Sequence, residues 1–323
     1  MQYIEDLKEG DRIKEVYLCK KLVNALTKTG KAYQTVTLQD KTGSVDGKVW
    51  EPDSPGIGEF EEGDYIWVTG DVTIFNNNNQ VNIRQLSRAA EGEYDPKEYV
   101  PASERNTEDM YGELLAMIAT VKVPYLRKLL EHFFVDDEQF KTQFSFHSAA
   151  KSVHHGFVGG LLEHTLSVTN VCDFFAKNYP FLDRDLLITA AICHDIGKVK
   201  ELSPYPKNDY TDEGQLLGHI MIGACMIRDA IDGIEGFPEV KKNELLHCIL
   251  SHHGELEFGS PKKPALVEAI ALSFADNVDA KMETMREALY TGKNVSYKWQ
   301  GFNRYIDSNI RRTSPEEYTE DGI

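Results

Sequence analysis

The sequence predicts a multidomain protein in which a small N-terminal β-barrel precedes an all-α domain. Three observations predict this division. Residues 1–90 consist of short alternating segments separated by turn residues, residues 91–109 are polar, acidic and punctuated by proline, and residues 110–312 have apolar residues at helical spacing. We therefore expect a barrel, an ordered linker and a helical domain over these ranges, followed by an acidic tail at 313–323.

Five segments in the first range have the composition of β-strands joined mostly by hairpins. Turn residues such as Thr29-Gly30 and Glu62-Gly63-Asp64 separate them. Within the second segment, Val36 and Leu38 alternate with more polar neighbours, as expected when one face is buried. Five strands with such connections favour a small barrel. The expected strands cover residues 16–26, 31–40, 44–50, 64–75 and 80–89.

The same alternation places aromatic and basic side chains on the outer face of the barrel. Tyr33, Lys48 and Trp50 fall on this face. Every nucleobase can stack on an exposed ring, and a lysine can neutralise a phosphate. We expect these three residues to bind a single strand. The alternative is that such aromatics cover a barrel end or pack against the second domain.

Seven side chains of metal-binding type occur in the helical range, at stations separated by 23 to 33 residues. They lie at the ends or on the apolar faces of successive expected helices. A buried ionisable group without a partner is costly, and metal coordination offsets this cost. Five histidines and two aspartates exceed the needs of one four-coordinate ion, so two ions that share a carboxylate are expected. The seven are His164, His194, Asp195, His219, His252, His253 and Asp276.

Adjacent ligands at His194 and Asp195 can meet two ions, with the carboxylate as the bridge. They follow an apolar run, and Gly197 suits the C-terminus of that helix. Lys198 would then reach an anionic oxygen bound at the same place, so Asp195 and Lys198 are the expected catalytic residues. Asp279 could replace Asp276 as a ligand, or it could be a solvated or supporting carboxylate. Imidazole and carboxylate ligands without thiolate favour Mn²⁺, Fe, Co or Zn over a structural zinc site.

The composition bounds the partners and the compartment. The net charge of −17 argues against nucleic-acid binding by the whole surface, but residues 1–90 hold 11 basic against 14 acidic residues and carry little of that excess. No apolar run approaches a membrane span, no signal peptide is visible, and the five cysteines are scattered. We expect a cytoplasmic protein with no membrane partner.

The ordered set H…HD…H…HH…D, with HDIGK at its centre, resembles the HD-domain metal-dependent phosphohydrolases. The segments HHGFVGGLLEHTLSV, AAICHDIGK and HHGELEFGSPKKP are similar to those of the YhaM family of bacterial 3′-to-5′ exoribonucleases, in which an OB-fold precedes an HD domain. LQDKTGSVDGKVW and FEEGDYIWVTGDV resemble an OB-fold of the tRNA-anticodon-binding type. The resemblance covers essentially the whole chain in the same domain order. It implies an enzyme that releases nucleoside 5′-monophosphates from the 3′ end of single-stranded RNA. Single-stranded DNA is a second substrate to test. The resemblance also implies two divalent metal ions, with Mn²⁺ as the first candidate.

Three further residues are weaker candidates for substrate binding. His154 and His155 precede His164 by about one loop and could contact the substrate phosphate or order the metal ligands. The alternative is an ordinary surface or core histidine pair. Lys262, in the segment after the double histidine, is a similar candidate for the phosphate.

Two other functions compete with the exonuclease. One is an HD-type hydrolase of small nucleotides, either a nucleotide phosphohydrolase or a cyclic-nucleotide phosphodiesterase, although a mononucleotide needs no stacking platform. The other is a non-catalytic nucleic-acid-binding protein, which the complete ligand set and Lys198 disfavour. The sequence leaves open the native metal, the preference between RNA and DNA, and whether the chain forms a homo-oligomer.

Overall fold

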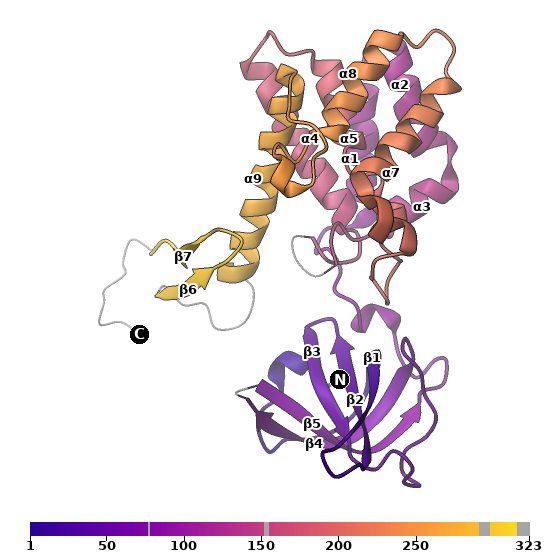
Figure 1. Cartoon of the computed structure of the whole chain (residues 1–323), viewed down its shortest axis with the longest axis vertical. Helices are drawn as coiled ribbons and strands as arrows, with labels where there is room; N and C mark the ends of the chain where they lie inside the picture. Colours follow the sequence, from indigo (N-terminus) through magenta and orange to yellow (C-terminus); the bar gives the residue numbers. More distant parts are fainter. Residues whose placement is uncertain (77, 152–154, 291–297, 315–323) are drawn as a thin grey trace. The chain divides into compact units, whose positions relative to one another are not determined.

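The computed structural model describes residues 1–76, 78–151, 155–290 and 298–314. The chain forms two compact units (Figure 1). The first consists of Met1–Glu104 with Ser203–Asp209, and the second of Arg105–Leu202 with Tyr210–Ile323. Most of the expected acidic tail, residues 315–323, lies outside the described residues.

Five strands close into a barrel in the first unit. Their order around the barrel is β1-β2-β3-β5-β4, with β1 paired to both β2 and β4, and all pairs are antiparallel except β3 with β5. This five-stranded closed arrangement is that of an OB-fold, as expected. All five expected strands are present, although the first begins four residues earlier. They are β1 (Arg12–Leu26), β2 (Ala32–Asp40), β3 (Gly43–Val49), β4 (Tyr65–Phe75) and β5 (Asn78–Arg88).

Strand alternation fills the barrel interior. Val36 and Leu38 of β2, Val49 of β3, and Ile66 and Val68 of β4 are all buried. Each such side chain contributes roughly 1.5–3 kcal/mol when it leaves water. The apolar set therefore stabilises the barrel without using the outer face.

The outer face of β4 is covered by chain that follows the barrel. The ring of Tyr65 stacks on Tyr94 with centroids 3.8 Å apart, and the indole N–H of Trp67 donates to Glu93 Oε2 at 3.0 Å. Tyr99, next to the short 3₁₀-helix Pro96–Glu98, adds an edge contact to Tyr65. Much of the expected linker is therefore ordered packing on the barrel.

Helices form nearly all of the second unit (Figure 1). Among them α5 is central, because every residue from Leu186 to Cys193 is buried and α4, α8 and α9 pack against it. No helix in the described part of the chain is both long and apolar enough to cross a membrane. The helices are α1 (Thr107–Ala119), α2 (Pro124–Glu131), α3 (Glu138–Phe146), α4 (Gly160–Asn178), α5 (Arg184–Cys193), α6 (Lys198–Glu201), α7 (Asp212–Asp232), α8 (Glu239–Leu250) and α9 (Val267–Tyr290).

A small hairpin interrupts the helical pattern that we expected up to residue 312. Strands β6 (Trp299–Asn303) and β7 (Ser308–Arg311) pair antiparallel. The side chain of Asn303 closes the turn, because its Oδ1 accepts the backbone N–H groups of Tyr305 and Ile306 at 2.9 and 3.1 Å. Asparagine favours such local turns over a helix interior.

The expected role of Gly197 as a helix C-terminus is wrong. Helix α5 ends at Cys193, and Gly197 has a right-handed φ of −65° as the residue before α6. A Cβ atom at this position would lie 2.1 Å from the carbonyl oxygen of His219 and 2.7 Å from the nitrogen of Gly223. Glycine is needed here for the close approach of two backbones, not for a left-handed turn.

Candidate metal centre

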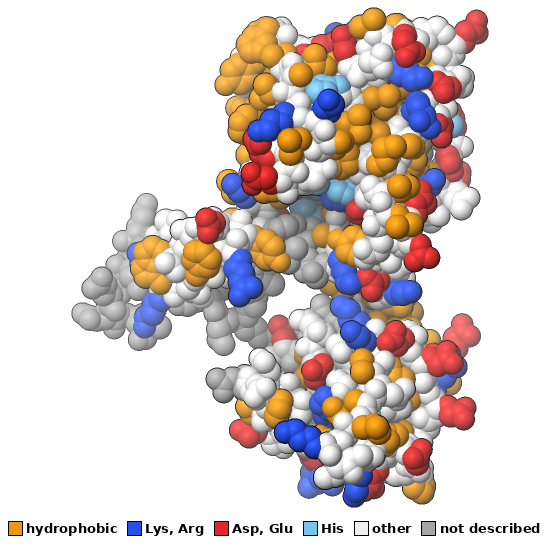
Figure 2. Space-filling view, viewed as in Figure 1, with side chains coloured by type: hydrophobic (Ala, Val, Ile, Leu, Met, Phe, Trp, Pro, Cys, Tyr) orange, Lys and Arg blue, Asp and Glu red, His pale blue; other side chains and the backbone are white. Residues whose placement is uncertain are grey.

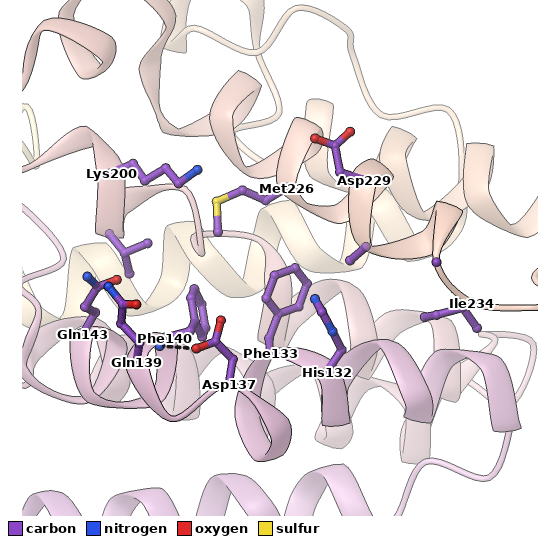
Figure 3. A pocket seen from close by; sticks show the side chains of 13 residues that line it. His132, Phe133, Asp137, Gln139, Phe140, Gln143, Lys200, Met226, Asp229 and Ile234 are labelled. Carbon is purple, nitrogen blue, oxygen red and sulfur yellow. Dashed lines mark hydrogen bonds between the residues drawn. The ribbon is translucent and has the colours of Figure 1, made fainter.

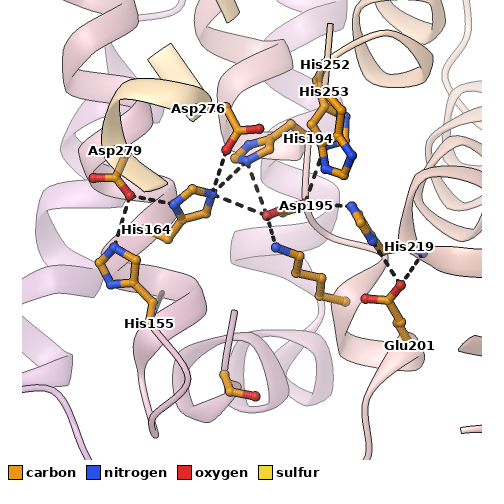
Figure 4. Close-up of polar contacts among 12 residues, drawn as sticks. His155, His164, His194, Asp195, Glu201, His219, His252, His253, Asp276 and Asp279 are labelled. Carbon is orange, nitrogen blue, oxygen red and sulfur yellow. Dashed lines mark hydrogen bonds and ion pairs between the residues drawn. The ribbon is translucent and has the colours of Figure 1, made fainter. Parts of the chain in front are cut away.

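The structure brings all seven expected ligands together inside the helical unit (Figure 4). They come from five places in the chain that are far apart in sequence but meet around the C-terminal end of α5. His164 lies on α4, His194 and Asp195 follow α5, His219 lies on α7, His252 and His253 follow α8, and Asp276 lies on α9.

Asp195 lies at the centre of the cluster and faces two groups of ligands. Its Oδ2 atom is 3.3 Å from Nε2 of His164 and 3.3 Å from Nε2 of His194. Its Oδ1 atom is 3.4 Å from Nε2 of His219 and 3.6 Å from Nε2 of His252. The carboxylate therefore has one oxygen for each of two neighbouring positions.

The remaining ligands complete these two positions. Ligand atoms of His164, His194 and Asp276 lie within 4.8 Å of one another, and so do those of His219, His252 and His253. With one oxygen of Asp195 added, each position has four potential ligand atoms, the number typical of zinc and within the range of the other transition metals.

The same kind of hydrogen bond fixes the tautomer of all five histidines. Each has an acceptor-only oxygen next to Nδ1, so Nδ1 must carry the proton and Nε2 keeps its lone pair for a metal. The acceptors are Asp279 Oδ2 for His164 (2.6 Å), the Ala191 carbonyl for His194 (2.7 Å), Glu201 Oε1 for His219 (3.0 Å), the Ile249 carbonyl for His252 (2.7 Å) and the Phe258 carbonyl for His253 (2.7 Å).

Three buried polar atoms of the cluster have no hydrogen-bond partner among the described residues. They are Asp195 Oδ1, His219 Nε2 and His252 Nε2, which face one another. A buried acceptor without a partner costs roughly 1–3 kcal/mol, and three that converge are hard to explain without a cation. The residues present fit a divalent ion at this position.

Electrostatics differ between the two positions. Burial raises the pKa of Asp195, but Lys198 and His194 outweigh it and hold that pKa well below its usual range. Burial lowers the pKa of His164, yet hydrogen bonds to Asp195 and other carboxylates raise it well above the ordinary value. Burial and the neighbouring His253 lower the pKa of His252 well below the ordinary value. Within one cluster, the pKa of His164 and the pKa of His252 are therefore shifted in opposite directions.

Lys198 contacts the Asp195 carboxylate directly. Its Nζ donates to Asp195 Oδ2 at 2.6 Å, and the lysine lines a cavity beside the cluster. Burial lowers the pKa of Lys198, but the charge of Asp195 outweighs burial and raises that pKa above the ordinary value. The expected role of Lys198 in binding an anionic oxygen stays a prediction.

Two carboxylates outside the seven hold ligands in place. Asp279 Oδ2 accepts from His164 Nδ1 and, at 3.0 Å, from His155 Nε2, so it has the position of a supporting carboxylate and not of a replacement for Asp276. Sequence reasoning missed Glu201. Its Oε1 accepts both the backbone N–H of His219 at 2.9 Å and the ring Nδ1–H, beside Gly218, whose φ of 72° breaks α7. The only sequence signal is its place three residues after Lys198.

The structure places the weaker candidates for substrate binding in different surroundings. His155 is buried, at a φ of 59°, and contacts Asp279, a position that suits ordering of the ligands. His154 lies outside the described residues. Lys262 is exposed and is not among the described residues that line the cavity beside the cluster.

The cavity beside the cluster has a volume of about 540 Å³. His164, Lys198, His253 and Asp276 line one side of it, and Tyr305, Ile306 and Asp307 of the β6–β7 turn also line it. A slightly larger cavity of about 580 Å³ lies between α3, α7 and the π-helical segment His132–Asp136 (Figure 3). None of the seven ligands lines that second cavity among the described residues, so the smaller one is the candidate active site.

Tyr33, Lys48 and Trp50 meet on the outer face of β2 and β3. The rings of Tyr33 and Trp50 stack with centroids 5.4 Å apart, and Lys48 Nζ lies 5.3 Å from the Tyr33 centroid. Trp50 is 52% exposed and its indole N–H donates to Asn82 Oδ1 at 3.2 Å. These rings are not part of the barrel core. They come together because β2 and β3 are paired neighbours in the barrel (Figure 1).

Comparisons with known proteins give a family match and a relative that spans most of the chain. The model of the HD domain family matches residues 161–281. The chain is 34% identical over 292 residues to the 3′-5′ exoribonuclease YhaM of Bacillus velezensis, a match that covers 89% of this chain and 91% of that protein. Among solved structures, the second OB-fold domain of replication protein A from Methanococcus maripaludis matches with 20% identity and a TM-score of 0.23, over 28% of this chain and 96% of that one.

Proposed function

The chain belongs to the family of the 3′-5′ exoribonuclease YhaM, and from this premise we propose that it is a metal-dependent 3′-to-5′ exonuclease that hydrolyses single-stranded RNA to nucleoside 5′-monophosphates. The observation that carries the proposal is the position of Asp195, whose two oxygens face two separate groups of imidazoles. Single-stranded DNA is the second substrate to test.

Two divalent ions would be held by this cluster. His164, His194, Asp276 and Asp195 Oδ2 would hold one, and His219, His252, His253 and Asp195 Oδ1 the other. Such ions supply Lewis acidity for the phosphate and for the activation of water. A ligand set of imidazoles and carboxylates without thiolate supports Mn²⁺ as the first ion to test, ahead of Fe, Co and Zn.

The residues around the ions have their own roles in this proposal. Lys198 would bind a non-bridging phosphate oxygen and neutralise charge that develops on the phosphate. Asp279 and Glu201 would keep the rings of His164 and His219 aimed at the ions. The cavity walls would position the last nucleotide beside the cluster.

The barrel would supply affinity that an acidic helical unit lacks. Tyr33 and Trp50 present stacked, partly exposed rings, and Lys48 lies over one of them. Base stacking on an aromatic ring is worth ~1–3 kcal/mol per base and tolerates any sequence. We propose that this face holds the single strand away from its 3′ end.

The decisive test compares substrates under one set of conditions. Single-stranded RNA labelled at its 5′ end, matched single-stranded DNA, and mononucleotides including cyclic ones are incubated with Mn²⁺, and EDTA serves as the control. We expect RNA to shorten from the 3′ end one nucleotide at a time, with nucleoside 5′-monophosphates as products, and a blocked 3′-terminal linkage to stop it. Hydrolysis of the small nucleotides with intact RNA would instead establish the hydrolase of small nucleotides.

A further inference from the structure

The β6–β7 hairpin exposes large aromatic side chains. Trp299 is 68% exposed and Phe302 is 60% exposed, and Tyr305 at the turn is exposed to the same extent as Phe302. Ile310 on β7 is buried, so the hairpin has a packed face and an open face. An open face is usually polar, and aromatic rings on it point to a binding role.

A bulge places two of these rings on one face. Trp299 pairs with Arg311 and Phe302 pairs with Asn309, with a register shift between the two pairs. Directly paired residues share a face, and positions 309 and 311 are two apart, so they also share one. Trp299 and Phe302 therefore lie on the same face, although three residues separate their numbers. Gly301, at a φ of 88°, gives the backbone the conformation that this irregularity requires.

The hairpin is basic in a strongly acidic protein. Residues 298–312 contain four basic residues and one acidic residue, a formal charge of +3 in a chain with a net charge of −17. Arg311 is exposed on the face that carries Trp299, and Arg304 is exposed at the turn. Figure 2 shows basic and apolar side chains next to one another over this part of the helical unit. The basic residues are Lys298, Arg304, Arg311 and Arg312.

The turn of the hairpin lines the candidate active site. Tyr305, Ile306 and Asp307 border the same cavity as Lys198 and Asp276. A polymer whose end is held beside Asp276 would therefore pass the residues of this turn. The hairpin belongs to the same compact unit as the metal centre.

From these observations we infer that the β6–β7 hairpin is a second binding surface for single-stranded nucleic acid, distinct from the barrel face. Trp299 and Phe302 stack bases close to the 3′ end, Arg304 and Arg311 contact phosphates, and Tyr305 borders the terminal nucleotide. Alternation of rings and cations is what a single-strand surface needs, because bases stack and phosphates carry charge. This inference rests on the proposed exonuclease function and names where its substrate is held.

The test uses the full chain with Trp299→Ala and Phe302→Ala combined. Phe174→Ala with Phe181→Ala is the matched control, because those rings are 61% and 70% exposed in the same unit and do not line the cavity among its described residues. We expect the KM for a 20-nucleotide RNA to rise at least about fivefold for each ring removed. Hydrolysis of bis(p-nitrophenyl) phosphate with Mn²⁺ should stay unchanged, since that small ester needs only the metal centre. The control should change neither value.

Two further measurements keep the test decisive. Trp299→Phe with Phe302→Tyr retains both rings and should restore the KM, whereas a failure to restore it would assign the loss to misfolding and overturn the inference. Light scattering follows the mass of each variant. A lower mass with an unchanged KM would make the hairpin a contact between copies of the chain, which also overturns the inference.

A failure of the proposed function would appear differently. Wild-type protein would then leave the RNA intact, whatever the hairpin variants do. Fluorescence anisotropy of a labelled RNA with EDTA present needs no hydrolysis and tests the hairpin on its own. Equal affinities of wild type and the double alanine variant in that measurement would remove the hairpin from RNA binding.

Discussion

The barrel and the helical unit place their functional residues in opposite ways. In the barrel, Tyr33 and Trp50 lie outside a core that consists of other residues, so the proposed binding would not use the side chains that stabilise the fold. In the helical unit, His164, His194 and Asp195 are buried within the packed interior. The proposed metal binding there would use side chains that also belong to the packed interior. Substitutions of these two barrel rings should therefore change RNA binding without changing stability, whereas substitutions in the metal cluster should change both metal binding and stability.

The largest effect is expected from Asp195→Asn. An amide carries no charge and can offer only its oxygen as a ligand, so at most one of the two positions keeps a ligand atom from residue 195. We expect hydrolysis of RNA to fall below about one per cent of wild type, while anisotropy still reports binding of a labelled RNA through the barrel. A variant that keeps more than a few per cent of the rate would show that the carboxylate does not bridge two ions.

Asp279→Asn should weaken metal binding by about 10- to 100-fold, because carboxylates that orient a ligating histidine are typically worth that much. The measurement is a titration of the metal-stripped protein with Mn²⁺, followed by elemental analysis, which should give two ions per chain for wild type. Asp173→Asn is the control, because Asp173 is also buried in the helical unit but pairs with Arg184 and Lys177. An equal loss of Mn²⁺ affinity in both variants would show that removing any buried carboxylate of the helical unit weakens metal binding.

Acid should destabilise the stripped protein through the same carboxylate. Burial raises the pKa of Asp279, but hydrogen bonds from His155 and His164 outweigh it and hold that pKa well below the ordinary value. Because this pKa is lower in the folded than in the unfolded protein, the ionised Asp279 stabilises the fold at pH values above the unfolded pKa of about 3.9. As the pH falls below that value, the free energy of unfolding decreases by up to ~1.4 kcal/mol per pH unit. Thermal melting in EDTA from pH 6 to 3 should show a smaller slope for Asp279→Asn than for wild type. Parallel curves would contradict this.

The smallest expected effect separates two tryptophans of the barrel. Trp50→Ala should weaken binding of a labelled RNA by at least about fivefold and leave the melting temperature almost unchanged, because the ring is exposed. Trp67→Ala should do the reverse, since its indole N–H bonds Glu93 in the covering segment. Loss of stability without loss of affinity in the Trp50 variant would make its ring a structural element.

Sequence reasoning reached the features that follow from periodicity and adjacency. Strand alternation located the barrel, and the neighbouring pair His194-Asp195 indicated the centre of the cluster. It missed Glu201, because nothing local shows that this side chain turns toward His219. Strand alternation also could not show which outward-pointing rings, such as Tyr33 and Tyr65, are covered by other parts of the chain. Both rings point outward, but only Tyr65 is covered, by Tyr94 from a later segment.

The β6–β7 hairpin was missed for a related reason. Its strands are short, and the bulge at Gly301 breaks the two-residue alternation that identifies a strand. The pairing of Trp299 with Arg311 is needed before the shared face becomes visible. Such register information is a property of the folded backbone and not of a single segment.

At Gly197 the segment that carries Asp195 touches the backbone of His219. Gly197 follows Asp195 by two residues, and its Cα hydrogen faces the carbonyl oxygen of His219, where a methyl group would collide at 2.1 Å. This contact sets how closely the backbone of His219 can approach the segment that carries Asp195. A side chain at position 197 would push the two segments apart and move His219 away from Asp195 Oδ1, which now lies 3.4 Å from its Nε2. Glycine at position 197 is therefore a condition for the two proposed metal positions to share one carboxylate.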